Sequence, residues 1–358
     1  MQMNRNHGRI RHTTAWVAAL SLLIGVAVAE DGADTGYDPA TAEAEIMPLA
    51  SKALVLDIDR VGSRFLAVGE RGHVLQSSDG VAWSQIPVPT RSELTALTYY
   101  GSRVVAVGHD QVILASLDGG LSWTRQHHDV QAQGPLLDAI FLDEDRTLAI
   151  GAYGQYCLRE SETWDCGYIS DHNVQDLRTA TSAAAQSPDL DEDVMADTAV
   201  GEEEGDPHLN GIVRTAQGTL LIVGEKGNYY RSTDGGESWA RNALPYRGSM
   251  FGVISLDDGV LIAYGLRGNA FASLDDGQSW TQMTTNTDQS LFGATALSGG
   301  RAVLVGGNGS VLLRRAGSLE TVNLTFSEGG MLATVTAIND QTFAVGGENG
   351  LATFQPGK

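Results

Sequence analysis

The sequence has few cysteines, few prolines and few basic residues, and each shortage excludes a class of protein. Two cysteines in 358 residues are too few for a small scaffold held together by disulfides. Nine prolines, and 43 glycines that follow no Gly-X-Y period, exclude a collagen. The 23 basic against 44 acidic side chains give a net charge of −21, which repels phosphate backbones and anionic lipid. We therefore expect a globular protein that does not bind nucleic acid.

Long apolar runs are also lacking, apart from one near the N-terminus. There, Arg5, Arg9 and Arg11 precede a largely apolar run of about 15 residues that ends at Ala29. Such a run is shorter than the ~20 residues of a membrane-spanning helix, and small residues occupy its end. Residues 1–29 are therefore predicted to be a cleaved signal peptide, with a retained anchor as the alternative. We expect a protein that is exported to the periplasm (or secreted or lumenal) and has no membrane insertion after cleavage.

An apolar residue followed by glycine recurs seven times at the end of an apolar run. The pairs are Val68-Gly69, Val107-Gly108, Ile150-Gly151, Val223-Gly224, Tyr264-Gly265, Val305-Gly306 and Val345-Gly346. Successive pairs lie 39 to 43 residues apart, except for one step of 73 residues that holds an insert. Seven units of this length predict an all-β, seven-bladed β-propeller with four-stranded antiparallel blades. The propeller is expected over residues 44–358, as a monomer, after a short tail at 30–43.

Each repeat contains the same succession of strands. An alternating run such as Leu54–Ile58 is expected to line the central channel, and a continuously apolar run such as 103–107 is expected to lie between blades. A glycine-bounded link, such as Gly69–Gly72, leads to the third strand. The seventh repeat has room for only three strands. We therefore expect residues 44–50 to supply its fourth strand and close the ring.

The third strand ends in the most specific motif of the chain, Ser-x-Asp-x-Gly-x-Ser-Trp. Three copies are complete and a fourth is one residue shorter; their acidic and aromatic positions are Asp79, Trp83, Asp118, Trp123, Asp234, Trp239, Asp275 and Trp280. These copies resemble Asp-boxes, which form the turn between the third and fourth strands of a blade. The carboxylate accepts backbone hydrogen bonds within its own turn. We therefore interpret these residues as structural.

The third repeat lacks this motif and instead contains the two cysteines. Cys157 and Cys166 are separated by eight residues, so they can face each other across a hairpin. An exported protein resides where such a bond persists. The sequence predicts a Cys157–Cys166 disulfide, with free thiols or a two-cysteine metal site as alternatives. No metal site and no cofactor are predicted.

An acidic insert is expected at residues 171–207, between the third and fourth blades. It carries many Asp and Glu residues and Arg178 as its one arginine, so we predict a disordered, solvated loop. Its Asp189-x-Asp191-x-Asp193 run is similar to the start of a calcium loop, but Val194 stands where that loop requires glycine. Loose calcium binding is the alternative.

The loops between second and third strands, and those that join successive blades, emerge on one face of an up-and-down propeller. Basic and aromatic side chains on such loops are preferred anchors of protein interfaces. The predicted binding residues are Arg71, Arg91, Tyr246, Arg247 and Arg267. The alternative for each of them is ordinary solvated loop charge.

Whole-blade phrases, such as Val68 to Gly80 and Val223 to Trp239, resemble the photosystem II stability/assembly factor family of seven-bladed propellers. The resemblance covers the mature chain, except for the acidic insert and for the Asp-boxes of the third and sixth blades, which are eroded. It implies a non-catalytic scaffold that binds a membrane protein complex or its subunits. The rival interpretation is a sialidase-like glycoside hydrolase or a propeller that binds carbohydrate or another small ligand. Sialidases, however, have six blades and an Arg-Ile-Pro motif, whereas Ile86-Pro87 here follows Gln85.

Overall fold

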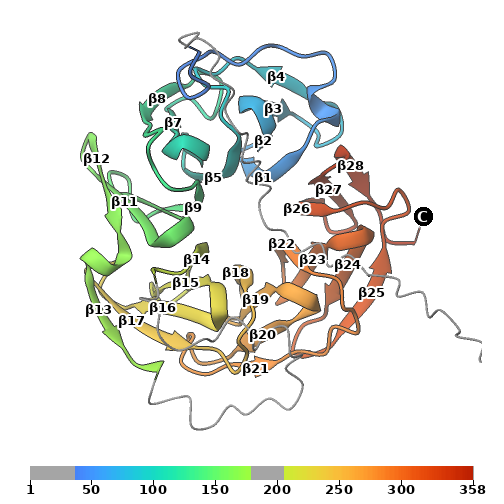
Figure 1. Cartoon of the computed structure of the whole chain (residues 1–358). Coiled ribbons are helices and arrows are strands. Elements are labelled where there is room, and N and C mark those ends of the chain that lie inside the picture. Colours follow the sequence, from blue (N-terminus) through green and yellow to red (C-terminus); the bar gives the residue numbers. More distant parts are fainter. Residues whose placement is uncertain (1–36, 179–204, 358) are drawn as a thin grey trace, which may run out of the picture. The chain divides into compact units, whose positions relative to one another are not determined.

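Seven sheets follow one another around a ring in the computed structural model of the chain (Figure 1). The structure describes residues 37–178 and 205–357, so the predicted signal peptide and the calcium-like run lie outside the described residues. The chain divides into Met1–Tyr37 and Asp38–Lys358, and the second unit holds all of the sheets. The predicted seven-bladed β-propeller is confirmed. No helix within the described ranges is long and apolar enough to cross a membrane.

The blades succeed one another in chain order, with the first strand of each on the inside. Blade 1 contains β1 (Val55–Val61), β2 (Arg64–Gly69), β3 (Val74–Ser77) and β4 (Ser84–Ile86), and blade 2 contains β5 (Leu94–Tyr100), β6 (Arg103–Gly108), β7 (Ile113–Ser116) and β8 (Thr124–His127). Blade 3 contains β9 (Leu136–Phe141), β10 (Thr147–Gly151), β11 (Gln155–Glu160) and β12 (Thr163–Tyr168). Blade 4 contains β14 (Leu209–Arg214), β15 (Leu220–Gly224), β16 (Asn228–Ser232) and β17 (Ser238–Ala243), with β13 (Asn173–Asp176) outside it.

The last three blades complete the ring. Blade 5 contains β18 (Met250–Ser255), β19 (Leu261–Gly265), β20 (Ala270–Ser273) and β21 (Thr281–Gln282). Blade 6 contains β22 (Leu291–Leu297), β23 (Arg301–Gly306), β24 (Ser310–Arg314) and β25 (Thr321–Thr325), and blade 7 contains β26 (Leu332–Asn339), β27 (Thr342–Gly347) and β28 (Gly350–Phe354). Each inner strand contacts the inner strand of the next blade, and β26 contacts β1.

Burial follows the predicted roles of the strands. In β2 every residue from Phe65 to Gly69 is buried, and β15 is buried throughout, because both faces of a second strand pack against neighbouring strands. The inner strand β1 instead has only three buried residues, Val55, Ile58 and Val61, and its other positions are partly or fully exposed. The hydrophobic core therefore lies between the blades, and the channel is lined by the remaining face of each inner strand.

The predicted closure of the ring by residues 44–50 is wrong. These residues form no strand, and blade 7 has three strands in the described part of the chain. The segment lies along β4 of blade 1 instead: Ala44 N–H donates to Val88 O (2.9 Å), and the Gln85 side chain bonds both Met47 N–H (2.8 Å) and the carbonyl of Glu45 (2.9 Å). Pro48, which has no N–H, further disfavours strand pairing. The ring closes through packing of β1 against β26 and β27.

The seventh glycine of the repeat is one residue later than the sequence indicated. Gly347 pairs with Leu332 as Gly69 pairs with Val55, and Glu348 N–H bonds Met331 O as Glu70 N–H bonds Leu54 O. Two consecutive glycines, Gly346 and Gly347, made the two registers indistinguishable in the sequence.

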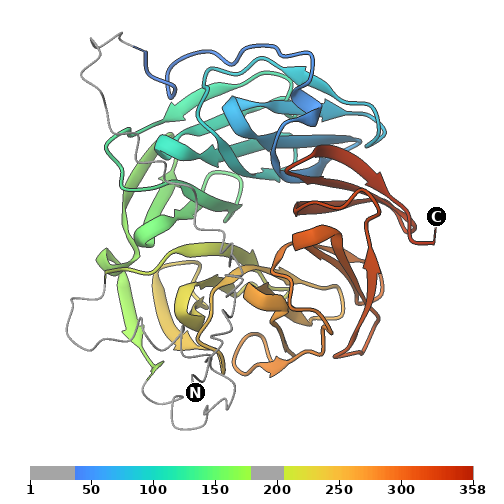
Figure 2. The same ribbon diagram turned by 45° about the vertical axis from the view of Figure 1, so that its right-hand side comes forward.

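The sequence predicted disorder throughout the acidic insert, but the first part of the insert is ordered. Residues Asn173–Asp176 form β13, which pairs in parallel with β17 on the outer edge of blade 4 (Figures 1 and 2). Val174 packs against the blade 4 core beside Trp239, and Leu177 N–H continues the ladder to Arg241 O (2.8 Å). At the other end, Ser170 Oγ donates to Asp206 Oδ2 (2.5 Å). The middle of the insert, residues 179–204, lies outside the described residues.

Two local predictions are confirmed by the contacts. Cys157 and Cys166 are direct partners on β11 and β12 and form a disulfide. In the turn after β7, Asp118 Oδ1 accepts the N–H groups of Leu121 and Ser122 (3.0 Å each), and the Ser122 hydroxyl donates to Asp118 Oδ2 (2.6 Å). These hydrogen bonds hold the pKa of Asp118 well below its usual range. The carboxylates of Asp79, Asp234 and Asp275 accept equivalent bonds.

Candidate functional site

Six links between second and third strands present one side chain each on the same face, which we call the link face. In each link a three-residue 3₁₀ turn places its central, non-glycine residue in the left-handed region. These residues are Arg71, Asp110, Tyr153, Lys226, Arg267 and Asn308, with φ of 53 to 56°. That conformation is unfavourable for a side chain with a Cβ. The repetition of this geometry in six blades gives the link face a fixed outer ring of side chains.

A second ring lies at the channel mouth on the same face. Every inner strand carries a β-bulge at the same point, immediately after the first residue that pairs with the neighbouring strand. A bulge leaves one residue unpaired and redirects its side chain. The bulged residues, here called the collar, are Leu56, Thr95, Leu137, Asn210, Phe251, Phe292 and Ala333, and each is half-buried.

The surface that the collar side chains expose to a ligand is mainly apolar. The rings of Phe251 and Phe292 lie 5.3 Å apart, from adjacent blades. The two polar members are already occupied, because Thr95 Oγ1 donates to Leu136 O (2.7 Å) and Asn210 Nδ2 donates to Met250 O (2.8 Å). Half-exposed aliphatic and aromatic side chains therefore surround the channel mouth, within an outer ring that is charged and polar.

Below the collar, channel carboxyls join neighbouring blades. Asp57 Oδ2 accepts Leu97 N–H (2.9 Å) from blade 2, and Asp138 Oδ2 accepts Ile212 N–H (2.8 Å) from blade 4. Burial raises the pKa of Asp57 to about 6 and that of Asp138 to about 7, although these backbone hydrogen bonds oppose the rise. Burial, together with the nearby charge of Asp57, raises the pKa of Asp59 to about 7. The contacts of Asp57 and Asp138 make both of them structural ties between blades.

All five predicted binding residues lie on the link face, but they form two groups. Arg71 and Arg91 belong to blade 1, where Gly72 packs against the backbone of Arg91. Arg71 is 72 % exposed. Arg91 is engaged by the N-terminal segment: its guanidinium lies 2.8 Å from Glu45 Oε1, and its Nε donates to Glu43 O (2.8 Å). Arg91 therefore holds residues 43–45 in place.

The second group lies on blades 4 and 5, across the ring from blade 1 (Figure 1). Tyr246 is half-buried, and its hydroxyl donates to Leu266 O (3.4 Å) beside Arg267. Burial raises the pKa of Tyr246, and the charge of Arg267 opposes this rise. Arg247 is exposed. The structure thus brings Tyr246, Arg247 and Arg267 together and separates them from Arg71 and Arg91.

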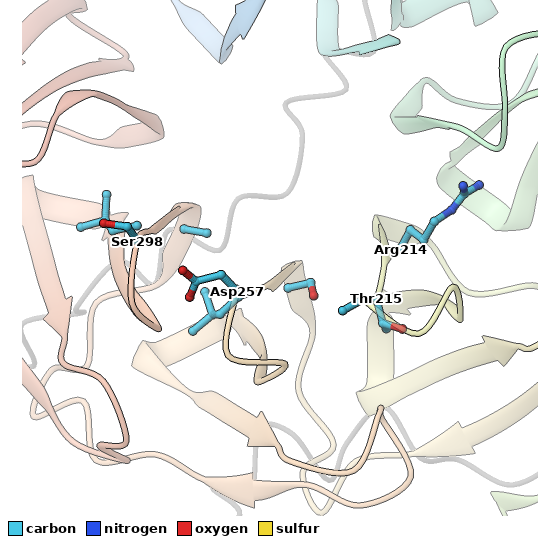
Figure 3. Close-up of a pocket in the computed structure, with 9 residues that line it drawn as sticks. Arg214, Thr215, Asp257 and Ser298 are labelled. Atoms are coloured by element: carbon cyan, nitrogen blue, oxygen red, sulfur yellow. The ribbon is translucent and has the colours of Figure 1, made fainter. Parts of the chain in front are cut away.

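The opposite face, which carries the Ser-x-Asp turns, has a shallow pocket at its channel mouth (Figure 3). The pocket has a volume of about 510 Å³ and lies between blades 4, 5 and 6. Its charged side chains already have partners, since Asp257 accepts the N–H groups of Gly299 (2.7 Å) and Gly300 (2.5 Å) while Arg214 donates to Leu142 O (2.5 Å). Within the described ranges, no cluster of His, Cys, Asp and Glu could hold a metal ion.

Comparisons with known proteins place this fold beside other propellers. No family profile matches the sequence, and no curated protein does. A solved structure titled "YCF48 bound to D1 peptide" is similar over 89 % of this chain and 97 % of its own, with a TM-score of 0.63 and 15 % identity. YCF48 from Cyanidioschyzon merolae has a TM-score of 0.61 and 16 % identity over 88 % of this chain and 99 % of its own.

The WD40 β-propeller domain of Doa1 is similar to the same degree. It covers 89 % of this chain and 96 % of its own, with a TM-score of 0.62 and 12 % identity. At these identities the likeness establishes a β-propeller fold.

Proposed function

We propose that this protein is an exported, non-catalytic scaffold that binds a protein partner on its link face. The observation that carries the proposal is the pair of rings, in which six left-handed links and seven bulges direct their side chains toward one face. Aromatic and arginine side chains around an apolar centre are the usual composition of a protein interface. The two rings contain no evident set of nucleophile, acid and base.

The partner we propose is a subunit of a membrane protein complex, in a role similar to that of a photosystem II assembly factor. A solved propeller of similar fold is described by its title as bound to a D1 peptide. This likeness supports our proposal that the present propeller also recognises a segment of a protein. The Cys157–Cys166 disulfide supports export, since such bonds persist in oxidising compartments.

The test is capture of a membrane protein from solubilised membranes of the source cell. The variant Arg71→Glu/Arg247→Glu alters two exposed link-face residues, and Arg60→Glu/Arg315→Glu makes the same change of charge at two exposed residues toward the opposite face. Arg91 is left unchanged because it holds the N-terminal segment. We expect the link-face variant to lose at least nine-tenths of the captured partner and the control to retain it. Equal capture by both variants would refute the assignment of the face.

A second candidate is glycoside hydrolysis in the channel, supported by the raised pKa of Asp59. Asp57 and Asp59 are two residues apart on β1, so they share one face of the strand. A carboxyl with a pKa of about 7 can act as a general acid. Turnover of aryl glycosides or sialosides that is abolished by Asp59→Asn would favour this function over the scaffold.

A further inference from the structure

Within residues 37–178 and 205–357, blade 7 has one strand fewer than the other blades. Six sheets have four or five strands, whereas the sheet of β26, β27 and β28 has three. Its outermost strand, β28, pairs with β27, and no other described strand pairs with it. Figures 1 and 2 show β28 at the rim of the ring, near the C-terminal end. The backbone groups on its outer side are therefore available for pairing.

An unpaired strand edge is a template for another strand, and proteins usually cover it. Here the cover is partial. The 3₁₀ turn η1 (Ala50–Lys52) contacts β28, and Gly350 at the start of the strand packs against the backbone of Ser51 and Lys52. Between Leu351 and Phe354 no described segment forms a hydrogen-bonded ladder on the outer side. This stretch is long enough for a short strand.

Exposed apolar side chains lie beside this edge. Ile46, Met47 and Leu49 are 59, 37 and 72 % exposed. They precede η1, which contacts both β4 of blade 1 and β28 of blade 7. On the other side, Leu324 and Ala352 pack only partly into the blade 7 core. An added strand would therefore find apolar surface as well as backbone partners.

The same protein accepts an added strand at another blade. On blade 4, β13 pairs with four residues of β17 and inserts Val174 beside Trp239. That strand comes from an otherwise polar segment. Blade 4 thus orders an extended segment of the same chain on its outer edge through a short ladder and one apolar side chain.

We propose that the outer edge of β28 is a strand-acceptor site that takes an extended segment of a partner protein as the fourth strand of blade 7. Residues 44–49 of the described chain are not the occupant, because Gln85 and Val88 hold them beside β4. A second copy is disfavoured because each chain carries a net charge of −21. The occupant is therefore a partner segment that alternates apolar and uncharged residues and is neutral or basic. This site is separate from the link face and does not depend on its function.

The test uses the full-length protein and a synthetic peptide with the sequence of β25 (Thr321–Thr325) flanked by lysines. We expect amide hydrogen exchange, resolved by NMR, to slow at least tenfold at alternate residues of Leu351–Phe354 when the peptide is saturating. Exchange in β4 and β17 should not change. The same peptide N-methylated at alternate amides, which removes one edge of donors, should not bind.

Two variants test the apolar contribution. Ile46→Ser/Leu49→Ser should weaken peptide binding at least fivefold. Leu117→Ser/Leu274→Ser, with side chains 73 and 74 % exposed in the Ser-x-Asp turns, should leave it unchanged. The absence of protection on β28 at millimolar peptide, protection of another edge instead, or equal binding of the N-methylated peptide would overturn the proposal.

Discussion

Replacement of Asp59 by asparagine is predicted to stabilise the protein at alkaline pH, and to stabilise it less at pH 5. Asp59 lies on β1 in the channel, where burial and the nearby Asp57 raise its pKa from 3.8 to about 7. Its Oδ1 accepts a hydrogen bond from Arg60 N–H (2.6 Å), which the asparagine carbonyl can accept equally well. The substitution therefore removes the charge and keeps the contact.

The sign follows from the raised pKa. The folded state binds a proton at Asp59 more tightly than the unfolded state does, so the contribution to stability is complete below pH 3.8 and is lost as the pH rises through 7. The difference between the two pKa values corresponds to ~4 kcal/mol in the free energy of unfolding if the charge is not screened. Because the side chain is only half-buried and channel water screens its charge, we expect ~1 kcal/mol.

The assay is urea unfolding of wild type and Asp59→Asn at pH 5 and pH 8.5. At pH 5 the folded-state side chains are both uncharged, but Asp59 of the unfolded state is already ionised, so the variant should be slightly more stable than wild type; at pH 8.5 its advantage should be larger. Asp165→Asn, at an exposed position on β12, is the matched control and should behave like wild type at both pH values. A variant that is less stable than wild type at pH 8.5, or equally shifted at both pH values, would refute the reasoning.

Three further predictions concern stability. Cys157→Ser/Cys166→Ser should lower the free energy of unfolding by ~2–3 kcal/mol, the entropy of closing a short loop, as measured by urea denaturation. Asp118→Ala leaves the N–H groups of its turn without their acceptor and should cost ~1–2 kcal/mol, seen as a lower Tm. Val174→Pro should detach β13 and increase proteolytic cleavage at residues 173–178, while the Tm changes by no more than a few degrees.

The repeat architecture could be predicted from sequence because its signals are local. The apolar-plus-glycine pair, the Ser-x-Asp turn and the two cysteines of one hairpin each lie within about ten residues. Such features specify backbone geometry directly, and their repetition along the chain makes the prediction of the fold more secure. The blade number, the four turns and the Cys157–Cys166 bond followed from them.

The collar could not be predicted in the same way. A bulge inserts one unpaired residue into an alternating strand, and the sequence around Leu56 or Phe251 reads as ordinary alternation or as a continuous apolar run. The one available signal was positional: the bulged residue follows the first buried residue of each inner strand in all seven repeats.

Two of the incorrect predictions concern segments outside the repeats. Residues 44–50 contain enough apolar residues for a strand, but the Gln85 side chain and Arg91 hold them on blade 1. Residues 173–176 are polar apart from Val174, yet the exposed edge of β17 supplies the partners that their own sequence does not reveal. In both segments the structure is determined by contacts between residues that are distant in sequence, and composition and periodicity do not reveal such contacts.

The most direct test of the scaffold proposal is site-specific photocrosslinking in native membranes. A photoreactive phenylalanine analogue would replace Tyr153 or Arg247 on the link face, and Leu117 or Leu274 on the opposite face; these side chains are all exposed. We predict that the two link-face positions crosslink to the same membrane protein subunit and that the two positions on the opposite face do not. Crosslinks to a membrane protein subunit from Leu117 and Leu274, with none from Tyr153 and Arg247, would contradict the account.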